Sequence, residues 1–174
     1  MSNLVFITLG SNIEPETYLP RAVQQLAERF TILAVSRVYE SAPLDATGAV
    51  AVGQGRFLNA AVLIDTDLHP AALKYGVLRA IEAALGRVRT ADKFAPRTID
   101  LDLALYGDLV LDAPDERLAL PDPDILTQAH VALPLADLAP DFAHPVTGLT
   151  LADIASQFEG QTGIAIRDDI RLAS

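Results

Sequence analysis

The sequence of 174 residues predicts an α+β fold in which helices cover both faces of an antiparallel sheet. Three observations support this prediction. Strand-like and helix-like segments alternate in the order β-α-β-β-α-β, 51% of the residues are hydrophobic, and no repeat, low-complexity tract or linker interrupts the chain. A chain of this size and composition can bury a sizeable core. We therefore expect one domain over residues 1–174.

The first half of the chain supplies a strand, a helix and two further strands. Residues 4–9 are an apolar, β-rich run that ends at Gly10, which predicts a buried strand. Residues 18–30 predict a helix, because apolar side chains recur there at helical spacing, at Leu19, Val23, Leu26 and Phe30. Residues 31–39 and 57–66 are typical of strands, and the long Gly-, Ala- and Pro-rich segment between them allows the two to pair as a hairpin.

A second helix and a polar strand follow. Pro70 suits a first helical turn, and periodic apolar residues continue the helix over residues 70–85 until Gly86 ends it. The strand after the next loop contains Asp100 and Asp102, and alternation along a strand points both carboxylates to one face. The opposite face of this strand carries Ile99, Leu101 and Leu103.

The last third of the chain adds short elements. Residues 129–138 are apolar enough for a buried helix, residues 151–158 predict a short helix, and residues 163–172 predict an extra edge strand. That edge strand belongs to a C-terminal extension, residues 159–174. The whole order predicts a ferredoxin-like antiparallel sheet with helices on both faces, a three-layer α-β-α arrangement.

The composition excludes several classes of protein. A formal net charge of −10 argues against a general affinity for nucleic acid or anionic lipid. No stretch reaches the roughly 18–20 apolar residues of a transmembrane helix, and no basic region precedes the first apolar run, so we expect neither a membrane span nor a signal peptide. The absence of cysteine excludes disulfides, thiolate metal sites and a cysteine nucleophile. We assign the protein to the cytoplasm.

Positive charge is concentrated in one segment of this acidic chain. Residues 79–97 contain five of the thirteen Lys and Arg residues and only two acids, which leaves a local charge of about +3. Arg suits phosphate because its planar fork makes two parallel hydrogen bonds, so the segment predicts a site for one compact anion. The alternative is a solvated basic helix end, since cations also favour the C-terminus of a helix. The carboxylate pair directly behind the segment favours the anion site.

Asp100 and Asp102 form a candidate metal site. Mg²⁺ usually relies on one or two carboxylates, water and substrate phosphates. Two such ions about 3.5–4 Å apart would clamp the attacking and leaving oxygens of a phosphoryl-type transfer. A D-x-D pattern alone is weak, because half-exposed strands often alternate polar and apolar residues, so its specificity comes from the full string PRTIDLDLALY. Neither lysine of the chain lies in the glycine pattern of a Walker A loop.

Five segments of the chain carry a resemblance to a known family. They are residues 9–12 (LGSN), 36–44 (SRVYESAPL), 57–62 (FLNAAV), 81–89 (IEAALGRVR) and 94–106 (FAPRTIDLDLALY). In this order they resemble the 6-hydroxymethyl-7,8-dihydropterin pyrophosphokinases of folate biosynthesis, and the resemblance extends over residues 4–158. In that family the β,γ-diphosphate of ATP is transferred to the hydroxymethyl oxygen of the pterin, and AMP is released.

The resemblance implies roles for the basic and acidic residues. Asp100 and Asp102 match carboxylates that bind two Mg²⁺ ions, and Arg87 and Arg97 match arginines of the catalytic loop and the triphosphate site. The implied ATP site consists of Glu82, Arg89, Phe94, Leu103, Arg117, Asp122 and Gln128. For Glu82 and Arg79, an exposed position on the helix is the alternative reading. The resemblance implies the two small-molecule substrates as partners. From charge and composition we expect no nucleic acid and no membrane as partner, and we expect a monomer.

The resemblance also implies a pterin pocket. Asn59 matches a side chain that hydrogen-bonds the ring, and Phe57 matches a stacking aromatic, although a lone aromatic on a strand is also an ordinary core residue. An amide inside the apolar run FLNAAVLI requires a hydrogen-bond partner, which supports a specific role for Asn59. The other residues expected at the pocket are Ser41, Ala42, Leu44 and His130.

Two substitutions depart from the family pattern. Asp122 stands where a histidine is expected near the nucleotide phosphates, and Gln128 stands where an arginine is expected. Both changes remove donors or positive charge from the implied triphosphate site, and Asp122 adds repulsion. They motivate an alternative function, a pterin-binding sensor or accessory protein with altered or lost use of ATP. An enzyme with the same chemistry in another pterin cofactor pathway is a further alternative.

Overall fold

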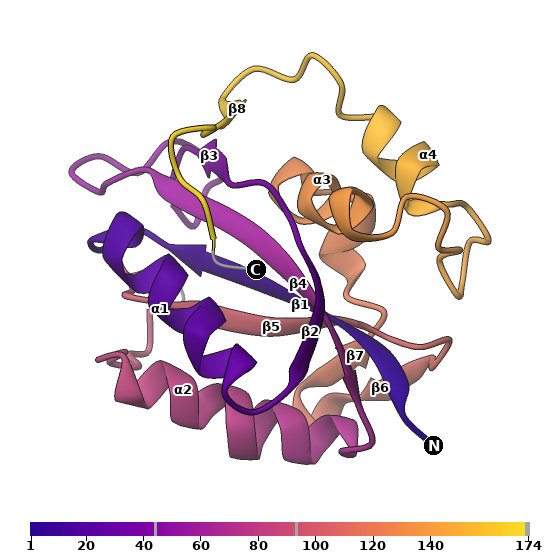
Figure 1. Ribbon diagram of the computed structural model, residues 1–174. Coiled ribbons are helices and arrows are strands. Elements are labelled where there is room, and N and C mark those ends of the chain that lie inside the picture. Colours follow the sequence, from indigo (N-terminus) through magenta and orange to yellow (C-terminus); the bar gives the residue numbers. More distant parts are fainter. Residues whose placement is uncertain (44, 93, 173–174) are drawn as a thin grey trace.

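The computed structural model describes residues 1–43, 45–92 and 94–172, and its centre is an antiparallel sheet (Figure 1). In this part of the chain the sheet has six strands: β1 (Asn3–Ser11), β2 (Thr31–Val35), β3 (Tyr39–Ser41), β4 (Phe57–Thr66), β5 (Asp100–Tyr106) and β8 (Ile164–Ile166). β1 lies between β4 and β5, while β4 also pairs with β2 and β3, and every pair is antiparallel. The predicted ferredoxin-like arrangement and the hairpin pairing of the second and third predicted strands are confirmed.

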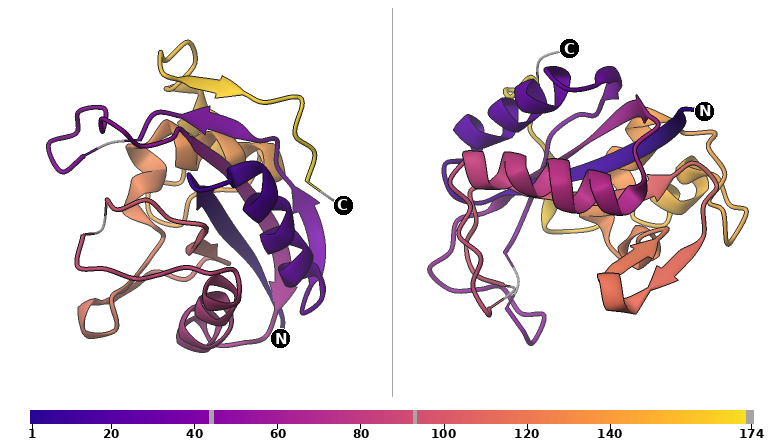
Figure 2. Two further views of the ribbon diagram at one scale, coloured as in Figure 1. Left: turned by 90° about the vertical axis from the view of Figure 1, so that its left-hand side faces the viewer. Right: turned by 90° about the horizontal axis from the view of Figure 1, so that it is seen from below.

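Helices cover both faces of the sheet, as predicted (Figures 1 and 2). One face carries α1 (Pro15–Ala27) and a continuous helix made of η1 (Ala72–Leu78) and α2 (Arg79–Ala84), and the other carries α3 (Ala129–Leu138) and α4 (Leu151–Ser156). Strand alternation divides β1 between two cores: Val5 and Ile7 pack with α1 and α2, whereas Phe6 packs with α3 and α4. None of the helices in the described residues has the length and apolar character needed to cross a membrane.

One predicted strand is divided in the structure. Residues 31–39 form β2 and then a break before β3 begins at Tyr39. Ser36 lies in the break, where its backbone N–H donates to the carbonyl of Ala61 at 2.9 Å and its Oγ accepts from the N–H of Ala61 at 2.8 Å. A side-chain oxygen thus replaces a backbone carbonyl of the ladder, so regular pairing with β4 stops there.

The predicted helix over residues 70–85 is present, but its first part is a π-helix, η1. The helix ends at Ala84, and Gly86 adopts a positive φ of 83°, which turns the chain back toward the sheet. A small hairpin of β6 (Leu111–Ala113) and β7 (Leu118–Leu120), joined by a 3₁₀ turn η2 (Pro114–Glu116), contacts η1 through backbone carbonyls. A second 3₁₀ turn, η3 (Pro123–Leu126), leads into α3.

The C-terminal segment forms the edge strand expected within residues 163–172. β8 pairs antiparallel with β3, so that Ile164 lies opposite Ser41. Just beyond β8, Arg167 donates to Glu40 of β3 at 2.5 Å. The extension is therefore attached to the strand that carries one of the residues predicted at the pterin pocket.

Candidate active site

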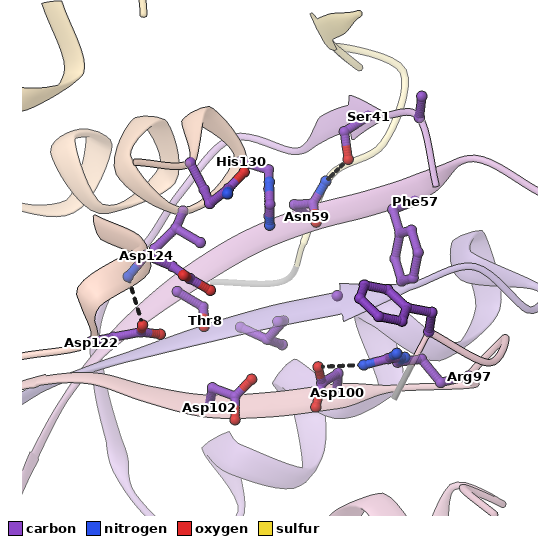
Figure 3. Close-up of a pocket in the computed structure, with 16 residues that line it drawn as sticks. Thr8, Ser41, Phe57, Asn59, Arg97, Asp100, Asp102, Asp122, Asp124 and His130 are labelled. Carbon is purple, nitrogen blue, oxygen red and sulfur yellow. Dashed lines mark hydrogen bonds and ion pairs between the residues drawn. The ribbon is translucent and has the colours of Figure 1, made fainter. Parts of the chain in front are cut away.

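A cavity of about 330 Å³ lies at one end of the sheet, where β1, β4 and β5 meet α3 (Figure 3). Its walls bring together residues that are far apart in the sequence. One side is acidic and consists of Asp100, Asp102, Asp122 and Asp124. The other walls include Ser41, Ala42, Phe57, Asn59, Phe94, Arg97, Gln128 and His130. Most of the predicted site residues thus surround a single space.

β5 directs Asp100 and Asp102 into this cavity, where they lie side by side (Figure 3). Both carboxylates are partly exposed, whereas Leu101 and Leu103 on the opposite face are buried in the core with α1 and α2. The predicted alternation along this strand is confirmed.

Two arginines contact Asp100. Arg87 Nη1 lies 2.8 Å from one carboxylate oxygen, and Arg97 Nη1 lies 3.0 Å from the other. Burial alone would raise the pKa of Asp100, but the charges and hydrogen bonds of Arg87 and Arg97 outweigh burial and hold that pKa below its ordinary value. Asp100 is therefore ionised at neutral pH.

Glu82 of α2 pairs with two arginines of this cluster and holds them in place. Its side chain is only 2% exposed, and it accepts a hydrogen bond from Arg87 at 2.7 Å and one from the backbone N–H of Leu101 at 3.2 Å. Arg89 also pairs with Glu82. The alternative reading of Glu82 as an exposed helix residue is wrong, because the turn after α2 folds the two arginines back over it.

Asp102 has no such partner. Within the described residues it makes no ion pair, and burial, together with the charges of Asp100 and Asp122, raises its pKa to about 7. Burial likewise raises the pKa of Asp122 to about 6. A cation bound between these carboxylates would relieve their repulsion.

The side chains at the cavity suit Mg²⁺ better than a metal whose ligands all come from protein side chains. No cluster of three or more metal-binding side chains occurs in residues 1–43, 45–92 and 94–172. Mg²⁺ needs only one or two carboxylates when water and substrate phosphates complete its octahedral shell. Asp100 and Asp102 face open space in the cavity, so they meet this requirement.

Asn59 and Phe57 of β4 form the part of the cavity opposite the acidic wall. The amide nitrogen of Asn59 donates to the carbonyl of Tyr39 at 3.1 Å and to Ser41 Oγ at 2.8 Å, so this buried amide has the partners its position requires. Phe57 is partly exposed to the cavity, and the guanidinium of Arg97 lies 5.8 Å from its ring centre. Phe57 is therefore a cavity wall rather than an ordinary core residue.

The segment that departs from the family pattern also lines the cavity. Asp122 caps η3, since its side chain accepts from the N–H of Asp124 at 2.9 Å. Gln128 immediately precedes α3, and His130 lies in its first turn. Burial lowers the pKa of His130, although the charge of Asp124 acts in the opposite direction, so the imidazole is neutral at neutral pH. The neutral ring is suited to stacking on a flat heterocycle.

A second cavity of about 350 Å³ lies between η1 and the β6–β7 hairpin. It holds Arg117, away from the carboxylate pair, together with Tyr75 and Arg79, whose guanidinium stacks 4.5 Å from the Tyr75 ring centre. Sequence reasoning missed Tyr75, which carries no motif. It also missed Asp124, although the repeated Pro-Asp of residues 121–124 was a visible signal.

Several predicted site residues line neither cavity. Arg87, Arg89 and Glu82 form the support behind Asp100, and Leu103 is buried in the core on the other face of β5. Leu44 falls outside the described residues. The roles predicted for these residues remain predictions.

Comparisons with known proteins agree on one family. The family model described as 7,8-dihydro-6-hydroxymethylpterin-pyrophosphokinase matches residues 6–140. A 2-amino-4-hydroxy-6-hydroxymethyldihydropteridine pyrophosphokinase of Pseudomonas aeruginosa is 40% identical over 92% of this chain and 96% of its own length. A protein of the same name from Methylorubrum extorquens is 42% identical over 78% of this chain and 82% of its own length.

Other similar proteins are much longer than this chain. The folic acid synthesis protein fol1 of Pneumocystis carinii is 38% identical over 89% of this chain, but the match spans only 20% of that protein. A crystal structure of wild-type Plasmodium falciparum HPPK-DHPS with pteroate superposes with a TM-score of 0.67 at 14% identity, over 91% of this chain and 42% of that one. At such low identity the superposition supports the fold alone.

Proposed function

Since the chain belongs to the 7,8-dihydro-6-hydroxymethylpterin-pyrophosphokinase family, a family of ATP-dependent diphosphotransferases, we propose that it transfers diphosphate from ATP to 6-hydroxymethyl-7,8-dihydropterin. The acceptor is the hydroxymethyl oxygen, and AMP is released. The observation that carries the proposal is the cavity in which Asp100 and Asp102 face Asn59 and Phe57. The wall with Asp100 and Asp102 suits metal-bound phosphates, and the wall with Asn59 and Phe57 suits a flat heterocycle. Because both walls enclose one space, the two substrates can bind next to each other for the transfer.

The pterin ring binds between Phe57 and His130, with Asn59 at its edge. Both rings line the cavity, and the amide of Asn59 is held in place by Tyr39 and Ser41 through its nitrogen. Among the described residues no group donates to the carbonyl oxygen of Asn59, which therefore accepts from an N–H of the pterin. Ser41 and Ala42 close the side of the pocket.

Asp100 and Asp102 would hold two Mg²⁺ ions, which would supply positive charge to the phosphates of ATP. Arg97 acts at the junction of the two substrates, because it contacts Asp100 at 3.0 Å and lies 5.8 Å from the ring centre of Phe57. Arg87, fixed by Glu82, keeps Asp100 ionised and oriented. The arginines stabilise charge on the transferred diphosphate while the hydroxymethyl oxygen attacks the β-phosphorus and AMP departs.

An assay that couples AMP formation to a spectroscopic signal tests this proposal. We expect AMP only when ATP, Mg²⁺ and the pterin are all present, and Asp100→Ala or Asp102→Ala should abolish it while circular dichroism shows an intact fold. ATP hydrolysis that does not depend on the pterin would contradict the proposal. Turnover that survives in both variants would move the metal site elsewhere.

A second candidate function rests on Asp122 and Gln128, which both line the cavity. Asp122 adds a negative charge where the phosphates of ATP are proposed to lie, and Gln128 is uncharged. In that case the protein binds a pterin as a sensor or accessory protein and does not use ATP. Calorimetry with the pterin and with α,β-methylene-ATP separates the two functions. Pterin binding without nucleotide binding supports the sensor, and binding of both supports the enzyme.

A further inference from the structure

A cluster of three polar side chains connects α3 to the sheet beside the proposed pterin pocket. Asp137 lies in the last turn of α3, Tyr39 is the first residue of β3, and Arg37 lies in the break between β2 and β3. The Tyr39 hydroxyl donates to one carboxylate oxygen of Asp137 at 3.0 Å. The Arg37 guanidinium donates to both oxygens of that carboxylate, at 3.2 and 2.8 Å. The cluster thus joins a helix to a strand that lies about a hundred residues earlier in the chain.

The bond between Tyr39 and Asp137 is the buried part of this cluster. Tyr39 is 3% exposed and the side chain of Asp137 is 16% exposed, whereas the side chain of Arg37 is 57% exposed. An exposed ion pair contributes little, but a buried hydroxyl that donates to a carboxylate makes a strong hydrogen bond. Burial, together with the charge of Asp137, raises the pKa of Tyr39 to about 12, so its hydroxyl keeps the proton that it donates.

Asp137 shares one face of α3 with a residue of the cavity. It follows His130 by seven residues, which is about two helical turns, so the two side chains lie on the same side of the helix. His130 lines the cavity and points from α3 toward Asn59 of the sheet (Figure 3). The face of α3 that carries His130 is therefore attached to the sheet roughly 10 Å further along the helix.

The other end of this connection also reaches the pocket. The backbone carbonyl of Tyr39 accepts from the amide of Asn59 at 3.1 Å, and Ser41 of the same strand accepts from it at 2.8 Å. Tyr39 is thus bound to α3 through its side chain and to a cavity residue through its backbone. Because β3 is only three residues long, its pairing with β4 and β8 gives it few other fixed points.

We propose that Asp137 is a positioning residue for the pterin, because its bond to Tyr39 fixes the distance between α3 and the sheet. This inference rests on the proposed function, in which the ring binds in the gap between His130 of α3 and Phe57 of β4. Stacking needs a gap of one width, since a widening of roughly 0.5–1 Å loses a quarter to a half of the dispersion attraction. The competing explanation is that the cluster stabilises the fold and does not affect the pocket.

Tyr39→Phe tests the proposal, because it removes the hydroxyl and keeps the buried ring. We expect the pterin to bind about 3-fold to 10-fold more weakly by calorimetry, with the affinity for α,β-methylene-ATP and Mg²⁺ unchanged. Asp137→Ala should act in the same direction. The matched controls are Tyr18→Phe, on α1 at the other face of the sheet, and Asp141→Ala, at an exposed position just beyond α3. Neither control should change either affinity.

A combined variant tests whether the gap carries the effect. His130→Ala removes one side of the gap, so Tyr39→Phe added to it should weaken pterin binding no further. Losses that multiply in the combined variant would overturn the inference. Unchanged pterin binding in Tyr39→Phe and Asp137→Ala would overturn it too, as would equal weakening of both substrates with a lower melting temperature. If the unmodified protein does not bind the pterin, the proposed function falls and this inference falls with it.

Discussion

Asp100 and Asp102 are two residues apart on one strand, yet their surroundings give their carboxylates opposite proton affinities. Arg87 and Arg97 lower the pKa of Asp100, whereas burial and neighbouring acids raise the pKa of Asp102 to about 7. A carboxyl whose pKa is raised on folding destabilises the folded state at any pH above its unfolded value, near 4. The negative charge of Asp102 thus lowers the free energy of unfolding, and a bound cation would reverse this loss.

Asp102→Asn should therefore stabilise the metal-free protein while abolishing activity. The folded protein binds more protons at Asp102 than the unfolded chain between about pH 4 and pH 7, so the stability of the wild type falls across that window. At pH 8 we expect the variant to gain on the order of 1–3 kcal/mol in free energy of unfolding, and at pH 5 much less. Urea unfolding at both pH values measures this, and an equal gain at both would contradict it.

The position of Asn59 leads to a prediction about substrate binding rather than stability. Asn59→Ala removes both the proposed contact to the pterin and the hydrogen bonds to Tyr39 and Ser41. We expect KM for the pterin to rise about 10-fold, since one good hydrogen bond contributes about 1–1.5 kcal/mol, with KM for ATP unchanged. Steady-state kinetics with each substrate varied in turn gives the answer. Gln161→Ala, at an exposed position, is the control.

At the scale of elements, each functional side chain is oriented by residues of a neighbouring helix or strand rather than by the element that carries it. β5 presents the carboxylates, but α2 supplies the buried Glu82 that orients Arg87. β4 presents Asn59, but β3 supplies the carbonyl and hydroxyl that orient it. β8 in turn supports β3, because Ile164 pairs opposite Ser41 and Arg167 pairs with Glu40. Edge pairing of this kind orders a strand as short as β3.

Removal of residues 163–174 tests the support from β8. We expect KM for the pterin to rise several-fold, because β3 loses its outer partner, while nucleotide affinity stays the same. The melting temperature should also fall, since Ile170 and Leu172 pack against the core. Arg171→Ala is a control within the same segment. Equal loss of affinity for both substrates would show that the segment supports the whole sheet rather than the pterin pocket.

At the scale of the whole molecule, one sheet separates two cores and leaves the site at its end. The protein has a formal net charge of −10, so its average field repels ATP. The basic cluster of Arg87, Arg89 and Arg97 opposes that field locally. Binding of the anionic substrate therefore depends on an electrostatic attraction that salt screens, whereas binding of the uncharged pterin does not.

Ionic strength should consequently act on one substrate only. Raising NaCl from 0.05 M to 0.5 M shortens the Debye length from roughly 14 Å to roughly 4 Å. We expect KM for ATP to rise several-fold and KM for the pterin to stay constant. Potassium acetate at matched ionic strength controls for effects specific to chloride. A pterin KM that rises in parallel would indicate a general loss of structure instead.

Much of this molecule was predictable from local patterns. The apolar runs of residues 57–66 and 129–138 predicted β4 and α3 with their bounds, because an element buried in the core needs apolar side chains at most of its positions. The shared face of the carboxylate pair was predictable from the alternation of side chains along a strand. Ser36 was not, because its Oγ replaces a ladder carbonyl only when Ala61, 25 residues away, lies beside it.

The sequence alone was enough to establish the order of elements, the shared face of Asp100 and Asp102, and the family, since each depends on short patterns that can be read segment by segment along the chain. Three-dimensional packing was needed to learn that Glu82 is buried under Arg87 and that Asp102, within the part of the chain that the structure describes, makes no ion pair. Proton affinities and ion pairs depend on distance through space and on burial, and neither is encoded at a fixed spacing along the chain.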